Sequence, residues 1–422
     1  MKQIATHPSG LRIVTYEMPY MNSVSVGIWI GAGGRYESLK QNGMSHFIEH
    51  LLFKGTEKRD GKEISQAIEG LGGILNAFTG EEFTCYYSKV LSEYFEATFD
   101  VLWDMVTNNY FKADHIDKEK SVVKEEISMY LDLPAQYVHD LLSNIMWPDQ
   151  PLGRILIGTE GSIDAMTNDT IVDYKNVFYR MNNIVVAVAG RLSHQEIYDT
   201  ISRYVESGAS QGKIPVAEAV VEKQDKPVSL IMNKDTEQTH FALGLRSFHR
   251  QHEDRYILKI LNTILGENMS SRLFQTIREE HGLAYSIHSS IERFMDTGSL
   301  VISAGVEEKN LIKTVELVCT ELRNLTQELV SDDELDRARK YAIGQLSLGL
   351  EKTMNIMLWS GENLLCTNNV PDVNEILDEL RRVNKEDILR ISRALFVDNN
   401  LNLSVIGPVK NKKIVEKALT VG

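Results

Sequence analysis

The 422-residue sequence is 43% hydrophobic and 25% charged, and its formal net charge at pH 7 is −14. Single hydrophobic cores stop growing near roughly 250 to 300 residues, which predicts two domains. The acidity excludes the basic footprint that nucleic-acid binding needs, and the lack of an apolar run of about 18 residues excludes a membrane-spanning segment.

The three cysteines are widely spaced and form no Cys-x-x-Cys pair. The sequence therefore predicts neither a disulfide framework nor a thiolate zinc site. Residues 1–8 have neither the apolar segment of a secretory signal nor the Arg and Ser bias of a transit peptide. We therefore expect a cytoplasmic protein.

The first clear element is a strand at 23–30, whose apolar residues predict burial, followed by a glycine turn at 31–34. These glycines do not have the G-x-G-x-x-G spacing of a dinucleotide-binding turn. A tight turn explains them, so no nucleotide site is predicted here.

Residues 43–54 predict a helix that ends at Gly55 and carries the motif HFIEH at 46–50. His46 and His50 are four residues apart, so their imidazoles lie on one face of the helix and can bind one metal ion. The carboxylate of Glu49 projects toward the same ion, where it can act as a catalytic base. The alternative is a pair of ordinary histidines near a surface glutamate.

A catalytic zinc ion usually has three protein ligands, so a third should come from another segment. A helix from about 115 to 131 supplies acidic candidates. Glu126 is the predicted ligand, because its helical neighbours at three and four residues' distance are apolar and an unpaired carboxylate among them would be costly. Glu119, two turns earlier, is predicted to orient a ligand, and Glu125 is predicted to be solvated. The neighbours of Glu126 are Val122, Val123, Met129 and Tyr130.

The two halves of the sequence follow the same plan. An Asn-Asn pair precedes an apolar strand ending in glycine at 184–190 and again at 401–407. The predicted helices starting near Asp117 and Asp336 are separated along the chain by almost the same number of residues as these two strands. Such a constant separation indicates duplication.

We therefore expect an α+β fold of two homologous domains, each a mixed, mostly antiparallel sheet backed by helices. The predicted domains are residues 1–212 and residues 228–422. A linker at 213–227 joins them, after a Gly/Ser-rich stretch.

Three segments resemble the pitrilysin/insulinase family of zinc metallopeptidases, and most closely its two-domain, processing-peptidase-like branch. The segments are Gly43-x-x-His46-x-x-Glu49-His50 with Phe53-Lys54-Gly55-Thr56, Gly73-x-x-Asn76-Ala77-Phe78-Thr79, and Glu119-x-x-Val122-Val123-x-x-Glu126. The order H-x-x-E-H is the inverted zinc-protease motif. The spacing from His50 to Glu126 is also the one that this family uses for its distal ligand.

The resemblance implies a zinc endopeptidase with one ion per chain in the first half, held by His46, His50 and Glu126, while the second half is a degenerate copy. It further implies that peptide substrates contact two pairs of residues. Asn76 and Ala77 would lie on the sheet edge nearest the metal, and Arg278 and Tyr285 of the second half would hold a substrate carbonyl.

The resemblance also implies assembly. Each chain would be half of a clamshell, so a homodimer would close a chamber that admits peptides or unfolded segments. Two alternatives stay open, namely a non-catalytic relative and a zinc hydrolase that acts on something other than peptides. For Arg278 and Tyr285 the alternatives are a surface cation and a half-buried strand residue.

Overall fold

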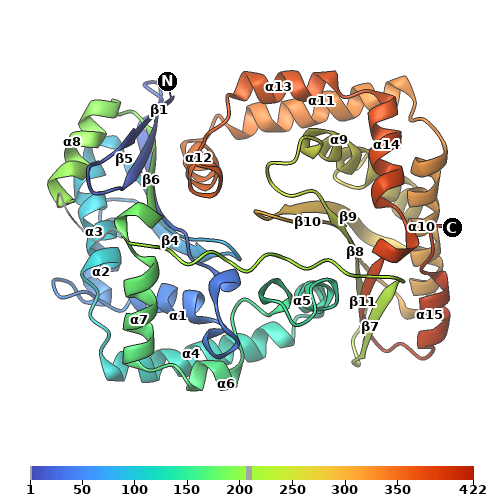
Figure 1. Ribbon diagram of the computed structural model, residues 1–422, viewed down its shortest axis with the longest axis horizontal. Helices are drawn as coiled ribbons and strands as arrows, with labels where there is room; N and C mark the ends of the chain where they lie inside the picture. The colour runs from blue at the N-terminus through green and yellow to red at the C-terminus, as the bar shows by residue number, and fades with distance from the viewer. Residues whose placement is uncertain (1, 206–211) are drawn as a thin grey trace. The chain divides into compact units, whose positions relative to one another are not determined.

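The computed structural model describes residues 2–205 and 212–422 as two compact units (Figure 1). Unit 1 comprises Met1–Ser128, Ile155–Glu218 and Ser347–Pro371, and unit 2 comprises Met129–Arg154, Ala219–Leu346 and Asp372–Gly422. Residues 206–211, near the end of the first predicted domain, lie outside the described part. Within that part, no helix is both long enough and apolar enough to cross a membrane.

Unit 1 contains a six-stranded sheet in the order β1-β2-β6-β3-β5-β4. The pair β2 and β6 is parallel and the other pairs are antiparallel. β6 is buried along its whole length, which explains why its sequence is apolar throughout instead of alternating. The strands are β1 Lys2–Thr6, β2 Arg12–Glu17, β3 Ser23–Ile30, β4 Ile74–Thr79, β5 Thr84–Leu91 and β6 Ile184–Gly190.

Helices cover both faces of this sheet, with α3 and α8 on one face and α12 on the other (Figure 1). The helices of unit 1 are α1 Met44–Leu52, α2 Gly61–Glu69, α3 Phe95–Thr107, α6 Glu160–Asp164, α7 Asn168–Phe178, α8 His194–Tyr204 and α12 Thr353–Thr367, together with most of α4 Ala113–Leu131.

Unit 2 contains a five-stranded sheet in the order β7-β11-β8-β10-β9, in which only β7 and β11 are parallel. The strands are β7 Val228–Asn233, β8 Thr239–Ser247, β9 Ala284–Arg293, β10 Gly298–Val306 and β11 Asn402–Gly407. The helices are α5 Pro134–Met146, α9 Arg255–Leu265, α10 Leu311–Gln327, α11 Asp332–Gly349, α13 Val373–Arg382, α14 Lys385–Leu395 and α15 Lys412–Ala418, with a π-helical segment η6 Phe274–Glu280.

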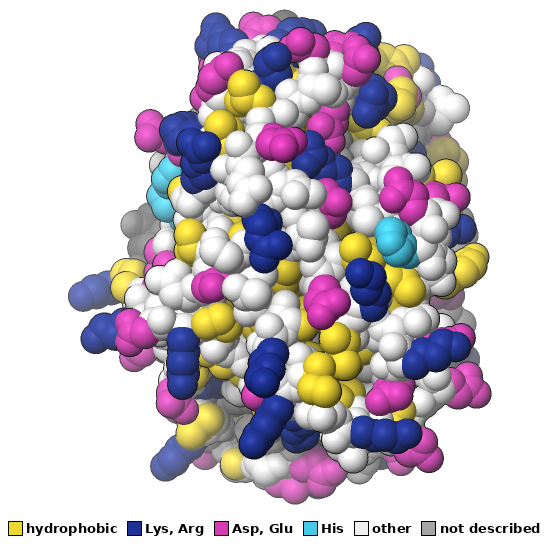
Figure 2. All heavy atoms as spheres, turned by 90° about the vertical axis from the view of Figure 1, so that its right-hand side faces the viewer, with side chains coloured by type: hydrophobic (Ala, Val, Ile, Leu, Met, Phe, Trp, Pro, Cys, Tyr) yellow, Lys and Arg dark blue, Asp and Glu magenta, His cyan; other side chains and the backbone are white. Residues whose placement is uncertain are grey.

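The two sheets repeat one topology. The order β2-β6-β3-β5-β4 in unit 1 matches β7-β11-β8-β10-β9 in unit 2, with the parallel pair in the same place. The predicted α+β architecture of mixed, mostly antiparallel sheets backed by helices is confirmed. On the face of unit 2 that Figure 2 shows, Lys and Arg side chains are interspersed with Asp and Glu and do not form a basic patch.

The compact units differ from the contiguous domains expected from the sequence, because each unit includes a helix from the other half of the chain. Helix α12 packs on β3 and β6 in unit 1, and α5 packs on β8 and β11 in unit 2. A sheet with an apolar face must be covered, and the duplicated sequence does not reveal which half supplies the cover.

Gly361 shows how closely α12 packs on the sheet of unit 1. A Cβ at this position would lie 2.1 Å from Nε1 of the buried Trp29. We expect Gly361→Leu to lower the free energy of unfolding by about 1 to 3 kcal/mol through overpacking, measured by urea denaturation. Gly344→Ala in α11 is the control, since a Cβ there meets nothing within 4 Å. An equally stable Gly361→Leu protein would contradict this account of the packing.

Candidate metal centre

The N-terminus of helix α1 is anchored by a buried carboxylate. Oε2 and Oε1 of Glu37 accept hydrogen bonds from the backbone N–H groups of Gly43 and Ser45, both at 2.7 Å. Gly43 has φ of +88°, and a Cβ there would lie 2.9 Å from Cα of Gly158. The glycine that starts the helix is therefore required by both its dihedral angle and the close approach of another backbone segment.

The loop after α1 is fixed by a second buried carboxylate, Asp104 of α3. It accepts hydrogen bonds from Oγ1 of Thr56 and Nη1 of Arg59, both at 2.7 Å, and from Nδ2 of Asn108 at 3.0 Å. Burial alone would raise the pKa of Asp104, but these donors lower it below its ordinary value. Asp104 therefore connects the end of α1 to the helical layer of unit 1.

The lowered pKa of Asp104 predicts that the stability of the fold depends on pH. A carboxyl with a depressed folded-state pKa stabilises the fold above its unfolded pKa, about 3.9, and loses that contribution as pH falls through the folded value. We expect Asp104→Asn to be less stable than wild type by about 1 to 3 kcal/mol at pH 7, with the difference shrinking below about pH 4. Urea denaturation across this pH range measures it, and a difference independent of pH would exclude the charge as its cause.

Three side chains converge on one point between α1 and α4. Oε2 of Glu126 lies 3.7 Å from Nε2 of His46 and 3.4 Å from Nε2 of His50. One ligand atom from each residue lies within 4.8 Å of the other two. Tetrahedral zinc with bonds of about 2.0 to 2.2 Å separates its ligand atoms by roughly 3.3 to 3.6 Å, so these three residues fit the ion.

Glu119 supports this cluster from the buried face of α4. Its Oε1 accepts a hydrogen bond from Nδ1 of His50 at 2.9 Å, and its Oε2 lies 2.8 Å from Nζ of Lys54. Burial opposes the charged form, but both contacts hold the pKa of Glu119 below its ordinary value. With Nδ1 of His50 engaged in this way, Nε2 presents its lone pair to the cluster.

The electrostatics of the cluster suit a cation. Burial, with a smaller effect of His50, lowers the pKa of His46 to about 4, so its imidazole is neutral at pH 7. Burial opposes the charged form of His50, but its hydrogen bond with Glu119 and the nearby carboxylates of Glu126 and Glu49 raise its pKa, so negative charge gathers at the cluster. A bound divalent ion would offset this excess of negative charge.

Glu49 lies beside the cluster and is bonded to the edge strand of the sheet. Its Oε2 accepts a hydrogen bond from Oγ1 of Thr79 in β4 at 2.5 Å. Burial raises the pKa of the Glu49 carboxyl, and the Thr79 hydrogen bond opposes part of this rise. A carboxylate with a raised pKa is a better base near neutral pH.

Asn76 and Ala77 lie on β4, as expected. β4 is the last strand of the unit 1 sheet, contacts α1 and, among the strands that the structure describes, pairs only with β5. Asn76 is exposed and Ala77 is half-buried. An extended peptide can pair with the open side of such an edge strand.

The environment of Glu126 differs from the expectation in one respect. The buried residues of α4 are Ile116, Glu119, Val123 and Ile127. Val122 and Met129, two of the four apolar neighbours of Glu126, are 48% and 61% exposed. Glu126 thus lies beside the buried stripe, on a face that is open and partly apolar, whereas Glu125 is exposed as expected.

Arg278 and Tyr285 come together in unit 2. The guanidinium of Arg278 lies over the rings of Phe274 and Tyr285, with centroid distances of 4.6 and 5.4 Å. Tyr285 is 82% exposed, so it is not the half-buried strand residue that was the alternative. The structure therefore pairs the two side chains and leaves the phenol open to solvent.

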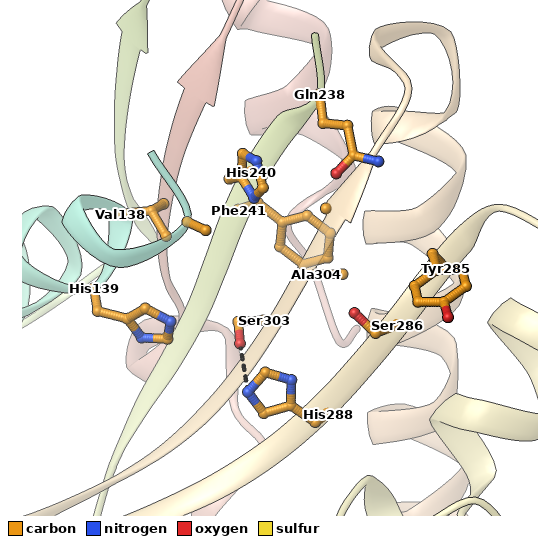
Figure 3. Close-up of a pocket in the computed structure, with 12 residues that line it drawn as sticks. Val138, His139, Gln238, His240, Phe241, Tyr285, Ser286, His288, Ser303 and Ala304 are labelled. Carbon is orange, nitrogen blue, oxygen red and sulfur yellow. Dashed lines mark hydrogen bonds between the residues drawn. The ribbon is translucent and has the colours of Figure 1, made fainter. Parts of the chain in front are cut away.

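A cavity of about 240 Å³ adjoins Tyr285 in unit 2 (Figure 3). Its imidazoles come from three elements, His139 of α5, His240 of β8 and His288 of β9, and Nε2 of His288 lies 3.1 Å from Oγ of Ser303. Burial lowers the pKa of His139 and of His240. Sequence reasoning missed this cavity because only the folded sheet brings these separated residues together.

Comparison with known proteins identifies the family. The pattern described as "Insulinase (Peptidase family M16)" matches residues 12–160, and that of "Peptidase M16 inactive domain" matches residues 165–341. The uncharacterized zinc protease YmxG of Bacillus subtilis is 37% identical over 406 residues, 96% of this chain and 98% of the relative. An uncharacterized zinc protease of Streptomyces coelicolor is 37% identical over 416 residues, 97% of this chain and 90% of the relative.

Solved structures show the same fold at lower identity. A protease from Helicobacter pylori matches with a TM-score of 0.90 at 22% identity, covering 97% of this chain and 99% of that one. A chain of Complex III2 from Candida albicans matches with a TM-score of 0.85 at 17% identity, covering 99% of both. One match is described as a protease and the other as a chain of Complex III2, so the fold alone does not specify an activity. The family patterns and the relatives of more than 30% identity show that this chain belongs to the insulinase family of peptidases, peptidase family M16.

Proposed function

We propose that this chain is a zinc-dependent endopeptidase that hydrolyses peptides or unfolded segments. The observation that carries the proposal is the convergence of one ligand atom each from His46, His50 and Glu126 within 4.8 Å. Two imidazoles and a carboxylate, with a fourth position open to water, form a known donor set of catalytic zinc sites. Membership of a peptidase family supports peptides as the substrate class.

The proposed chemistry assigns a role to each side chain. His46, His50 and Glu126 would hold the zinc ion, which would supply Lewis-acid chemistry by lowering the pKa of water and polarising a carbonyl oxygen. Glu49 takes the proton of the attacking water and passes it to the nitrogen of the leaving amine. Glu119 orients His50 through the Nδ1 hydrogen bond.

Substrate binding is proposed to use both halves of the chain. The open side of β4, including Asn76 and Ala77, pairs with an extended peptide through backbone hydrogen bonds, which favours affinity without strong sequence preference. Arg278 and the Tyr285 hydroxyl donate hydrogen bonds to a substrate carbonyl. The exposure of Tyr285 supports this role, because a buried phenol would not reach a substrate.

We further propose a cytoplasmic homodimer that encloses a chamber and holds one zinc ion per chain. Two-fold symmetry is the simplest arrangement for two identical chains. Light scattering tests the dimer, and cell fractionation tests the location. Comparing a folded protein with its unfolded form as substrates tests the chamber, which should admit only the unfolded chain. A fully active monomer would exclude the dimeric chamber.

Incubation with a peptide library tests the proposed activity. The purified chain should release internal cleavage products that mass spectrometry identifies, a chelator should abolish them, and added zinc should restore them. A chain that binds zinc but cleaves no peptide would favour a hydrolase of another substrate class. A chain that binds no zinc would favour a non-catalytic relative.

Glu126 and Glu125 are neighbours with opposite expected phenotypes. Glu126→Gln should lose most bound zinc, because a neutral amide replaces one of three ligands. Glu125→Gln should stay within about 0.5 kcal/mol of wild-type stability and keep its zinc, because its side chain is exposed. Metal analysis after dialysis measures both variants. Zinc content that follows position 125 would remove Glu126 from the ligand set.

A further inference from the structure

We propose that Thr79 is a positioning residue that holds the carboxylate of Glu49 in its reactive orientation. This inference rests on the proposed role of Glu49 as the base. Thr79 belongs to the motif at 73–79, but no role for it followed from the sequence. The geometry points to it through one contact, the 2.5 Å hydrogen bond from Oγ1 of Thr79 to Oε2 of Glu49.

The donor in this contact is held rigidly. Thr79 is the last residue of β4 and pairs with Thr84 of β5. The next residue, Gly80, starts a tight turn in which its N–H donates to the carbonyl oxygen of Phe83 at 2.8 Å. Strand pairing on one side and this turn on the other fix the backbone from which the hydroxyl projects.

The carboxylate of Glu49, which accepts this hydrogen bond, needs a partner that restrains it. Helical periodicity brings Glu49 to the side of α1 that carries His46, three residues earlier, but it does not fix the orientation of the Glu49 carboxylate. A glutamate side chain has several rotatable bonds and loses much freedom when it is held in one orientation. The hydroxyl holds Oε2 and leaves Oε1 free to accept the proton of the attacking water.

The location of the donor has a second consequence. Thr79 lies on the same strand as Asn76 and Ala77, whose open side we propose to pair with substrate. The strand that would align the substrate backbone then also holds the carboxylate of Glu49, although Glu49 itself belongs to α1. Displacing a catalytic group by about 1 Å can cost on the order of a hundredfold in rate.

Thr79→Val removes the hydroxyl and keeps the shape of the side chain. We expect kcat to fall by about ten- to a hundredfold, with KM and zinc content close to the wild-type values. Thr79→Ser keeps the donor and should restore kcat to within a few fold. A Thr79→Val protein with wild-type kcat, or a Thr79→Ser protein as impaired as Thr79→Val, would overturn the proposal.

Thr84→Val is the matched control in the same hairpin. It loses a buried hydroxyl that donates to the carbonyl oxygen of Ala32 at 2.9 Å. We expect lower stability with nearly wild-type kcat. A kcat loss equal to that of Thr79→Val would instead indicate general damage to the hairpin and overturn the positioning role.

A double variant tests whether Thr79 acts through Glu49. In the Glu49→Gln background, Thr79→Val should change the residual kcat by less than about twofold, because the group it positions is gone. An undiminished effect of Thr79→Val in this background would overturn the proposal.

Crystal structures of the zinc-loaded wild type and Thr79→Val provide a readout that does not depend on peptide cleavage. We expect the Glu49 carboxylate to be displaced in Thr79→Val, and an unmoved carboxylate would count against the inference. If the wild type cleaves no peptide, the proposed function fails, while these two structures still decide the role of Thr79.

Discussion

Glu49→Gln is expected to keep its zinc and to lower kcat by about 10²- to 10⁴-fold. The amide has the size of the carboxylate but cannot take a proton from water. The hydroxyl of Thr79 can still donate to the amide oxygen, so the side chain should keep its place. The ligands His46, His50 and Glu126 are untouched. Metal analysis and peptide-cleavage kinetics on the same preparation separate binding from chemistry.

Glu69→Gln in α2 is the matched control, because the same change is made on an exposed residue. It should leave both kcat and zinc content unchanged. A Glu49→Gln protein that cleaves peptides at the wild-type rate would remove Glu49 from the mechanism. A protein that loses its zinc would show instead that Glu49 helps to hold the ion.

His50→Ala is expected to lose both zinc and activity. Two ligands, His46 and Glu126, would remain, and they would hold the ion weakly. Glu119 would also lose its hydrogen-bond donor on the helix and retain Lys54 as a partner. Zinc analysis, together with the thermal midpoint with and without added zinc, measures the loss, because a ligand that binds only the folded state raises that midpoint.

His115→Ala provides the control on α4. His115 is partly exposed and is not among the converging residues. We expect it to keep one zinc ion per chain and to be stabilised by added zinc as wild type is. If His50→Ala retained the full zinc response, the ion would bind elsewhere in the chain and the proposed ligand set would be wrong.

The local features of the site were predictable from the sequence. His46 and His50 share a helix face because a helix has 3.6 residues per turn, and this periodicity needs no knowledge of the rest of the fold. The repeated topology was also predictable, because the alternation of strands and helices recurs along the chain. The structure pairs Glu119 with His50, and the orienting role expected of Glu119 stays a prediction.

The exposure of the α4 face that carries Glu126 could not be predicted from the local sequence pattern. The apolar neighbours of Glu126 predict a buried stripe, yet Val122 and Met129 on that face are exposed. The reason is physical, since a surface that carries apolar residues for binding has the same local pattern as a surface that packs in a core. The spacing from His50, which matches the family, predicts Glu126 as the ligand without any assumption about burial.

Only the tertiary structure decided which distant groups meet. The contacts of Lys54 with Glu119 and of Thr79 with Glu49 join separate elements, and periodicity within one helix or strand carries no information about such pairs. The same holds for α5 and α12, each of which completes the sheet of the other half. Sequence patterns indicate that an apolar face will be covered, but the choice of the covering helix depends on the three-dimensional path of the whole chain.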